Sequence, residues 1–153
     1  MDKVNIFAPA SIGNAGACYD IMGYALDYVG DFVTLEKVER ADENIIWGGV
    51  DGPFAGELIG VPYTENCAWL VCNHIYENYF DGRASNFSLR LKLHKHMPVG
   101  SGLGSSAASS AAAAAAVIEL LGLQMGGAQI TDSLKVGESA ASGTGHLDNV
   151  CLL

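Results

Sequence analysis

Apolar and polar residues alternate most regularly between Phe87 and His94. Phenylalanine or leucine occupies every second position of this segment, and serine, arginine, lysine and histidine fill the positions between them. Successive side chains of a β-strand point to opposite faces of a sheet, so the pattern predicts a strand with one buried and one polar face. We expect Pro98 to end the extended segment, because proline has no N–H to donate to a sheet.

Three other segments carry helical signals. Apolar residues recur three or four positions apart over residues 66–80, which is typical of one face of a helix. The segment Ser105–Leu121 is rich in alanine, the residue with the highest helix propensity, and Gly122 is expected to end it. A further helix is predicted over residues 131–141, with Gly143 just beyond it.

The N-terminal part of the chain predicts strands separated by loops. Residues 4–8 form the first predicted strand, which ends at Pro9, and residues 31–40 form the second. Glycine, alanine and polar residues predict a loop over residues 11–20. Residues 41–64 are rich in Gly, Pro, Asp and Glu, which predicts short strands and turns. Strands and helices are thus mixed, the early strands have an antiparallel character, and the α+β class is favoured.

The composition is that of a packed globular domain. A chain of 153 residues is expected to form one domain. Half of the residues are hydrophobic and 16% are charged, unlike the composition of a disordered chain. The net charge of −9 argues against nucleic acid and anionic membranes as partners, because both attract basic surfaces. A polyanion must therefore be held by local backbone geometry rather than by the overall field.

The cysteines and the lengths of the apolar segments indicate in which cellular compartment the protein is expected. Four cysteines are present without a CxxC pair, and no segment resembles a signal peptide, so we expect reduced thiols and a cytoplasmic protein. No apolar run approaches the roughly 20 residues that a membrane-spanning helix needs.

The segment from Pro98 to Ala108 has the features of a phosphate-binding loop. Its three glycines allow a backbone with positive φ and a close approach to a ligand. The helix that follows points unpaired N–H groups at the loop, and its dipole places about half a positive charge there. Such a terminus binds di- or triphosphates. The hydroxyls of Ser105 and Ser106 can cap the helix, bind phosphate oxygen or ligate Mg²⁺.

Other glycine-rich loops fit this segment less well. A Walker A loop needs a lysine that is absent here, and the dinucleotide fingerprint has a different glycine spacing. The glycine loop of protein kinases joins two strands, whereas this loop opens a helix. A plain strand-to-helix turn with a serine cap is the remaining alternative.

The run Pro-x-x-x-Gly-Leu-Gly-Ser-Ser-Ala-Ala over residues 98–108 resembles the second motif of the GHMP kinases, a family of galactokinases, homoserine kinases, mevalonate kinases and phosphomevalonate kinases. Residues 7–20 resemble the homoserine kinase branch, with Gly-Ala-Cys-Tyr at 16–19 in place of its usual Gly-Pro-Gly-Phe. Residues 137–143 and 146–150 are also similar to that branch.

The resemblance implies a fold and an activity. The fold is the GHMP kinase N-terminal domain, a ribosomal protein S5 domain 2-like sheet with helices on one side, expected to span residues 1–153. The reaction is phosphorylation of L-homoserine by Mg-ATP in threonine biosynthesis, and family members tend to form homodimers. Homoserine kinases continue well past the segment at residues 146–150, so we expect the C-terminal GHMP domain to be absent from this chain.

The resemblance also assigns roles to residues. Ser106 and Glu138 would be the catalytic residues that ligate Mg²⁺, and a carboxylate at Asp20 would hold the ammonium of homoserine. Asn14 and Asn149 would orient the substrate. The implied ATP-binding residues are Asn66, Pro98, Val99, Gly100, Ser101, Gly102, Leu103, Gly104, Ser105, Ser106, Ala107 and Ala108.

For several residues the sequence allows two roles. Asn66 is either a helix cap or a residue near adenine, and Lys95 either reaches the nucleotide or ends a strand in solvent. His94 and His96 have a spacing that can serve a metal, or they lie on a solvent-facing edge. Asp148 is a base or a supporting group, and no residue is a clear catalytic base.

Two alternative functions remain open beside homoserine kinase. One is another GHMP kinase acting on a mevalonate-type or sugar substrate. The other is a nucleotide-binding module that does not turn its ligand over.

Overall fold

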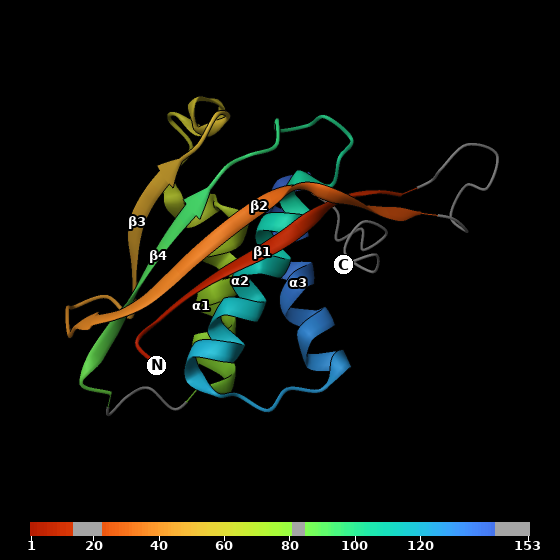
Figure 1. The fold of residues 1–153 in the computed structure, drawn as a ribbon. Coiled ribbons are helices and arrows are strands. Elements are labelled where there is room, and N and C mark those ends of the chain that lie inside the picture. Colours follow the sequence, from red (N-terminus) through yellow and green to blue (C-terminus); the bar gives the residue numbers. More distant parts are fainter. Residues whose placement is uncertain (14–22, 81–84, 143–153) are drawn as a thin grey trace.

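The computed structural model describes residues 1–13, 23–80 and 85–142. Within these residues four strands form one mixed sheet, and three α-helices pack together on one of its faces (Figure 1). This arrangement confirms the predicted α+β class. The elements are β1 (Lys3–Ile12), β2 (Tyr24–Glu39), β3 (Ile45–Asp51), the 3-10 turns η1 (Ala55–Leu58) and η2 (Tyr63–Glu65), α1 (Cys67–Tyr79), β4 (Phe87–His94), α2 (Ser105–Leu121) and α3 (Gly127–Ser142).

The sheet has the strand order β1-β2-β4-β3. Strand β2 pairs antiparallel with both β1 and β4, whereas β3 and β4 are parallel. Parallel neighbours need a crossover connection, and α1 supplies it between β3 and β4. After β4, the chain continues through residues 95–104 to the start of α2.

The core lies between the sheet and the helices. The alternating leucines of β4, Leu89, Leu91 and Leu93, are at most 1% exposed, which confirms the strand and its buried face. Helix α2 contacts β1, β2, α1 and α3. Most of its alanines are buried, and their small side chains allow this close approach on several sides.

The predicted end of the first strand at Pro9 is wrong. Strand β1 continues to Ile12, and its register with β2 shifts between Pro9 and Ala10. Strand β2 begins at Tyr24, well before the predicted start, and carries three extra residues in the bulge opposite Pro9. Proline is tolerated there because β1 is an edge strand and the ladder is already interrupted. An added Cβ at Gly30, which pairs with Pro9, would lie 2.1 Å from the Ala8 carbonyl oxygen.

The helix predictions are confirmed with one correction. Helix α2 has the predicted bounds, and Gly122 ends it in the left-handed conformation with φ 65°. Helix α3 begins at Gly127 rather than at residue 131. The amide oxygen of Gln129 accepts from the Gly126 N–H at 2.8 Å, half of a capping box that the periodicity does not reveal.

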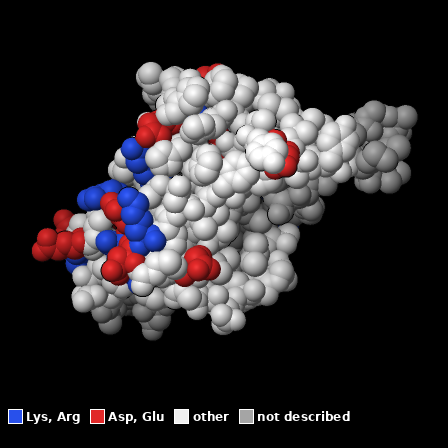
Figure 2. Space-filling model, in the orientation of Figure 1, with Lys and Arg blue, Asp and Glu red and all other residues white. Residues whose placement is uncertain are grey.

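The sheet face without helices carries the charged side chains of neighbouring strands. Figure 2 shows basic and acidic groups side by side on one part of this face, and they form ion pairs. Lys3 and Arg90 both contact Glu36, and Lys92 lies 2.8 Å from Asp51. None of the described helices is long and apolar enough to cross a membrane.

Candidate functional site

Three glycines shape the loop between β4 and α2. Gly100, Gly102 and Gly104 have φ of 68°, 77° and 64°, the left-handed region that other residues rarely adopt. A Cβ added at Gly100 or Gly102 would meet no atom within 4 Å. Glycine is therefore needed for backbone conformation, and the space beside the loop is open to a ligand.

The loop opens onto the N-terminus of α2. Gly104 is the N-cap residue, and no described side chain caps the helix. The hydroxyls of Ser105 and Ser106 thus do not act as the helix cap, one of the roles considered for them. The first-turn N–H groups, together with the helix dipole, remain directed at the loop, an arrangement suited to an anion.

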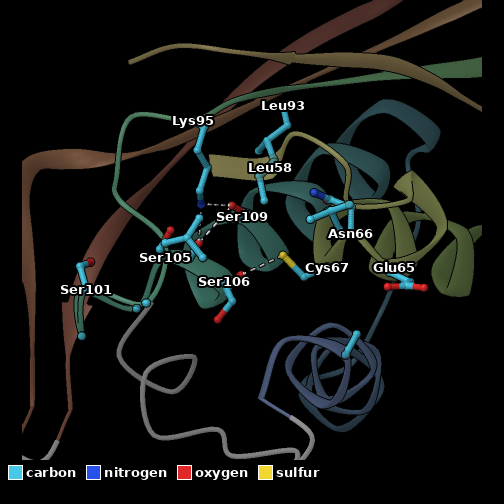
Figure 3. A pocket seen from close by; sticks show the side chains of 16 residues that line it. Leu58, Glu65, Asn66, Cys67, Leu93, Lys95, Ser101, Ser105, Ser106 and Ser109 are labelled. Carbon is cyan, nitrogen blue, oxygen red and sulfur yellow. Dashed lines mark hydrogen bonds between the residues drawn. The ribbon is translucent and has the colours of Figure 1, made fainter. Parts of the chain in front are cut away.

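A cavity of about 430 Å³ lies at this helix end, within the size range of small-molecule sites (Figure 3). Eight of the predicted ATP-binding residues line it: Asn66, Val99, Gly100, Ser101, Gly102, Gly104, Ser105 and Ser106. Pro98, Leu103, Ala107 and Ala108 are not among the lining residues, and both alanines are fully buried in the core. Their predicted contact with ATP stays a prediction.

The cavity lining is both apolar and polar. Leu58, Val61, Leu93 and Val99 give apolar surface, and serine hydroxyls with the loop backbone give polar surface. A carboxylate oxygen of Glu57 accepts from the Val99 N–H at 2.6 Å and fixes the loop against η1. A lining of this mixed kind suits a ligand that has both apolar and charged parts.

Asn66 is the N-cap of α1, one of the two interpretations given to it. Its amide oxygen accepts from the N–H groups of Ala68 at 3.0 Å and Trp69 at 3.4 Å. Asn66 also lines the cavity. The cap uses the amide oxygen, which leaves the amide NH₂ for a ligand, so both roles are compatible.

Ser106 lines the cavity, and Glu138, 32 positions further along the chain in α3, contacts this serine. The Ser106 hydroxyl donates to a Glu138 carboxylate oxygen at 3.2 Å. Glu138 is buried, with 6% exposure, so it is not a solvated helix residue. The Cys67 thiol donates to the Ser106 carbonyl oxygen at 3.7 Å, and burial raises the pKa of that thiol, which keeps it neutral. The two oxygens of Ser106 and Glu138 suit a hard cation such as Mg²⁺.

Beneath the loop lies a buried ion pair that sequence reasoning missed. Lys95 is 3% exposed and pairs with the fully buried carboxylate of Asp31. Lys95 is therefore not a solvated strand end. The sequence did contain a sign of this pair. Asp31 is a charged residue within an apolar strand, and Ser109 is a polar residue within a run of alanines. The partners of these residues, however, are set by the tertiary fold.

The predicted substrate residues Asn14, Asp20 and Asn149 lie outside the described residues, as does Asp148. Their roles stay predictions.

The two histidines do not converge on a metal site. His94 is half-buried, and its Nδ1 lies 2.5 Å from Asp51 Oδ1 while its Nε2 lies 2.9 Å from Thr34 Oγ1. His96 packs edge-on against the Phe32 ring. No group of three potential metal ligands occurs among the described side chains.

Comparison with known proteins places this chain in a family. Residues 63–153 match the family model of the GHMP kinase N-terminal domain. Homoserine kinase of Methanococcus vannielii is 35% identical over 150 residues, covering 98% of this chain and 47% of that protein. Homoserine kinase of Chloroherpeton thalassium is 34% identical, covering 97% and 47%. The chain thus spans about half the length of the curated relatives it matches.

Solved structures agree. Homoserine kinase from Cytophaga hutchinsonii matches with a TM-score of 0.81 and 30% identity, over 99% of this chain and 45% of that one. Mevalonate kinase from methicillin-resistant Staphylococcus aureus has a TM-score of 0.68 at 17% identity, a likeness of fold alone. The chain therefore belongs to the GHMP kinase family and has the fold of its N-terminal domain.

Proposed function

We propose that this chain is the nucleotide-binding half of a homoserine kinase, which transfers the γ-phosphoryl group of Mg-ATP to the side-chain hydroxyl of L-homoserine. The observation that carries the proposal is the Ser106–Glu138 pair beside the uncapped start of α2. Similarity to homoserine kinases over nearly the whole chain supports the choice of acceptor.

The donor atoms fit a magnesium nucleotide. Phosphoryl transfer depends on positioning and charge neutralisation more than on covalent chemistry. Ser106 Oγ and the Glu138 carboxylate would hold Mg²⁺, and the loop N–H groups would hold the phosphates. The buried Ser105 Oγ has no hydrogen-bond partner among the described residues and lines the same cavity, so it can donate to a phosphate oxygen. When bound, Mg²⁺ neutralises the charge on the phosphates.

The acceptor would be held by residues from the two ends of the chain. Asp20 would bind the ammonium group of homoserine, and Asn14 and Asn149 would orient its carboxylate and hydroxyl. We assign no catalytic base, and the proposal relies on alignment of the hydroxyl with the γ-phosphate.

An acceptor panel tests the proposal. The purified chain would be incubated with ATP, Mg²⁺ and L-homoserine, mevalonate or galactose, and ADP formation would be followed. We expect ADP to form with homoserine alone. Turnover with mevalonate or galactose would instead indicate another GHMP kinase, and ATP binding without turnover would indicate a nucleotide-binding module.

Two serine variants test the loop assignment. Ser106→Ala should lower homoserine-dependent turnover by at least about tenfold, because it removes a metal ligand worth more than about 1.4 kcal/mol in the transition state. Ser110→Ala, one helical turn further along α2, should change turnover by less than about threefold. Equal turnover in the two variants would contradict the role of Ser106.

A further inference from the structure

We propose that Lys95 and Asp31 form a positioning pair for the phosphate-binding loop, and that Lys95 does not itself donate to a phosphate. This inference rests on the proposed nucleotide site. Figure 3 shows the Lys95 side chain reaching to the start of α2, where it meets Ser105 and Ser109.

The donors of Lys95 are fully used inside the protein. An ammonium group has three N–H donors. Nζ of Lys95 donates to the Asp31 carboxylate, to the Ser105 carbonyl oxygen at 3.2 Å and to the Ser109 hydroxyl at 3.0 Å. Although Lys95 borders the cavity, no donor is left for a ligand. Its contacts hold the first turn of α2 instead.

Asp31 holds the other side of the loop. Its Oδ1 accepts from the backbone N–H groups of His96 at 2.8 Å and Met97 at 3.1 Å, just before Pro98. Its Oδ2 accepts from Lys95 and from the Ser109 hydroxyl at 2.8 Å. The carboxylate therefore connects β2, the segment entering the loop and helix α2.

The pair also cancels its own charge. Both groups are almost completely removed from water, so either one alone would be a buried, uncompensated charge. Phosphate binding is left to the loop N–H groups and the helix terminus, whose directions depend on the position of the loop. Removing either partner should shift the loop and weaken phosphate binding, whereas binding of the nucleoside should be unaffected.

The test compares Mg-ATP with adenosine as ligands of the full chain. Lys95→Met, Asp31→Asn and the double variant would be titrated with each ligand. Lys92→Met is the matched control, because Lys92 lies on β4, three residues before Lys95, but pairs with Asp51 on the opposite sheet face. Lys95→Met and Asp31→Asn should each weaken Mg-ATP binding by at least about tenfold, which corresponds to one hydrogen bond to a charged group. Each should weaken adenosine binding by less than about twofold.

The Asp31→Asn variant separates positioning from direct contact. If Lys95 contacted phosphate, neutralising Asp31 would free its charge and Mg-ATP binding would be unchanged or stronger, and the proposal would be overturned. An equal loss of ATP and adenosine binding in the variants would overturn it too. If the pair positions the loop, the two residues act as one unit. The double variant should then bind Mg-ATP at least as tightly as the single variant with the lower affinity.

A milder variant covers the case in which the single charge variants do not fold. Ser109→Ala removes the hydroxyl shared by both charges and leaves the ion pair intact. It should weaken Mg-ATP binding about fivefold and leave adenosine binding unchanged. Unchanged Mg-ATP binding in folded Ser109→Ala would contradict the proposal. Failure of the wild-type chain to bind Mg-ATP would instead contradict the proposed function itself.

Discussion

Adding one carbon at Gly137 tests how α3 positions Glu138. A Cβ on Gly137 would lie 2.5 Å from Ser110 Oγ, 2.8 Å from Val71 Cγ2 and 3.3 Å from the Cys67 carbonyl oxygen. These neighbours belong to α2 and α1, so α3 packs tightly against both helices at Gly137. We therefore expect Gly137→Ala to displace α3 outward, away from the Val71 side chain and the Cys67 backbone.

The magnitude follows from two opposing terms. Ordinary contacts are 3.4–4 Å, so α3 has to move by roughly 1 Å, and overpacking of this kind costs about 1–3 kcal/mol. Alanine gains about 1 kcal/mol over glycine in a helix interior. We expect a net loss of about 1 kcal/mol in the free energy of unfolding. The Ser106–Glu138 hydrogen bond, already 3.2 Å long, should be lost with the shift.

Gly127→Ala is the matched control, because an added Cβ at this position in the same helix meets no atom within 4 Å. Urea unfolding would give the stability of both variants, and ATP titrations with Mg²⁺ and with EDTA would give the metal-dependent part of the affinity. Gly137→Ala should be less stable than Gly127→Ala. It should also lose the part of the ATP affinity that depends on Mg²⁺. Equal stability with an unchanged Mg²⁺ effect would refute the reasoning.

Two further predictions concern the surroundings of the site. Asn66→Ala should lower the free energy of unfolding by about 1 kcal/mol through loss of the α1 cap, whereas Asn66→Asp should retain the cap; equal urea midpoints for both would contradict this. The hydrogen bond from Lys92, followed by contacts with His94, holds the pKa of Asp51 below its ordinary value. Since the folded-state pKa is depressed, this stabilisation is present above about pH 4 and is lost as the pH falls through the folded-state pKa. Asp51→Asn should therefore be less stable than wild type at pH 7, and the difference in unfolding free energy should disappear in acid; a difference that is independent of pH would exclude this linkage.

The sequence predicted those elements whose cause is local. The alternation in β4, the alanines of α2 and the glycines of the loop each act within a few residues, and the structure has these elements where expected. The fold class followed from their order. The start of α3 was missed because its cap depends on one side chain, Gln129, rather than on periodicity.

Features that depend on distant partners were not predictable. Lys95 and Asp31 are 64 positions apart, and nothing near either residue reveals that they meet. The path of β1 through Pro9 depends on its being the outermost strand, which is a property of the whole sheet. Ser106 and Glu138 were paired only through a family resemblance, and the structure places their side chains in hydrogen-bond contact.

The bulge at Pro9 also limits what can attach to β1. An outermost strand presents free backbone groups on which the strand of another molecule can grow, a route to aggregation. Pro9 has no N–H to offer, and the register shift beside it interrupts the ten-residue strand. Beyond the register shift, the Ser11 N–H already donates to the Leu103 carbonyl oxygen at 3.0 Å, so an incoming strand would meet unpaired outward backbone groups mainly over the residues before Pro9. The irregularity thereby opposes intermolecular β-sheet growth at the longer of the two outer strands.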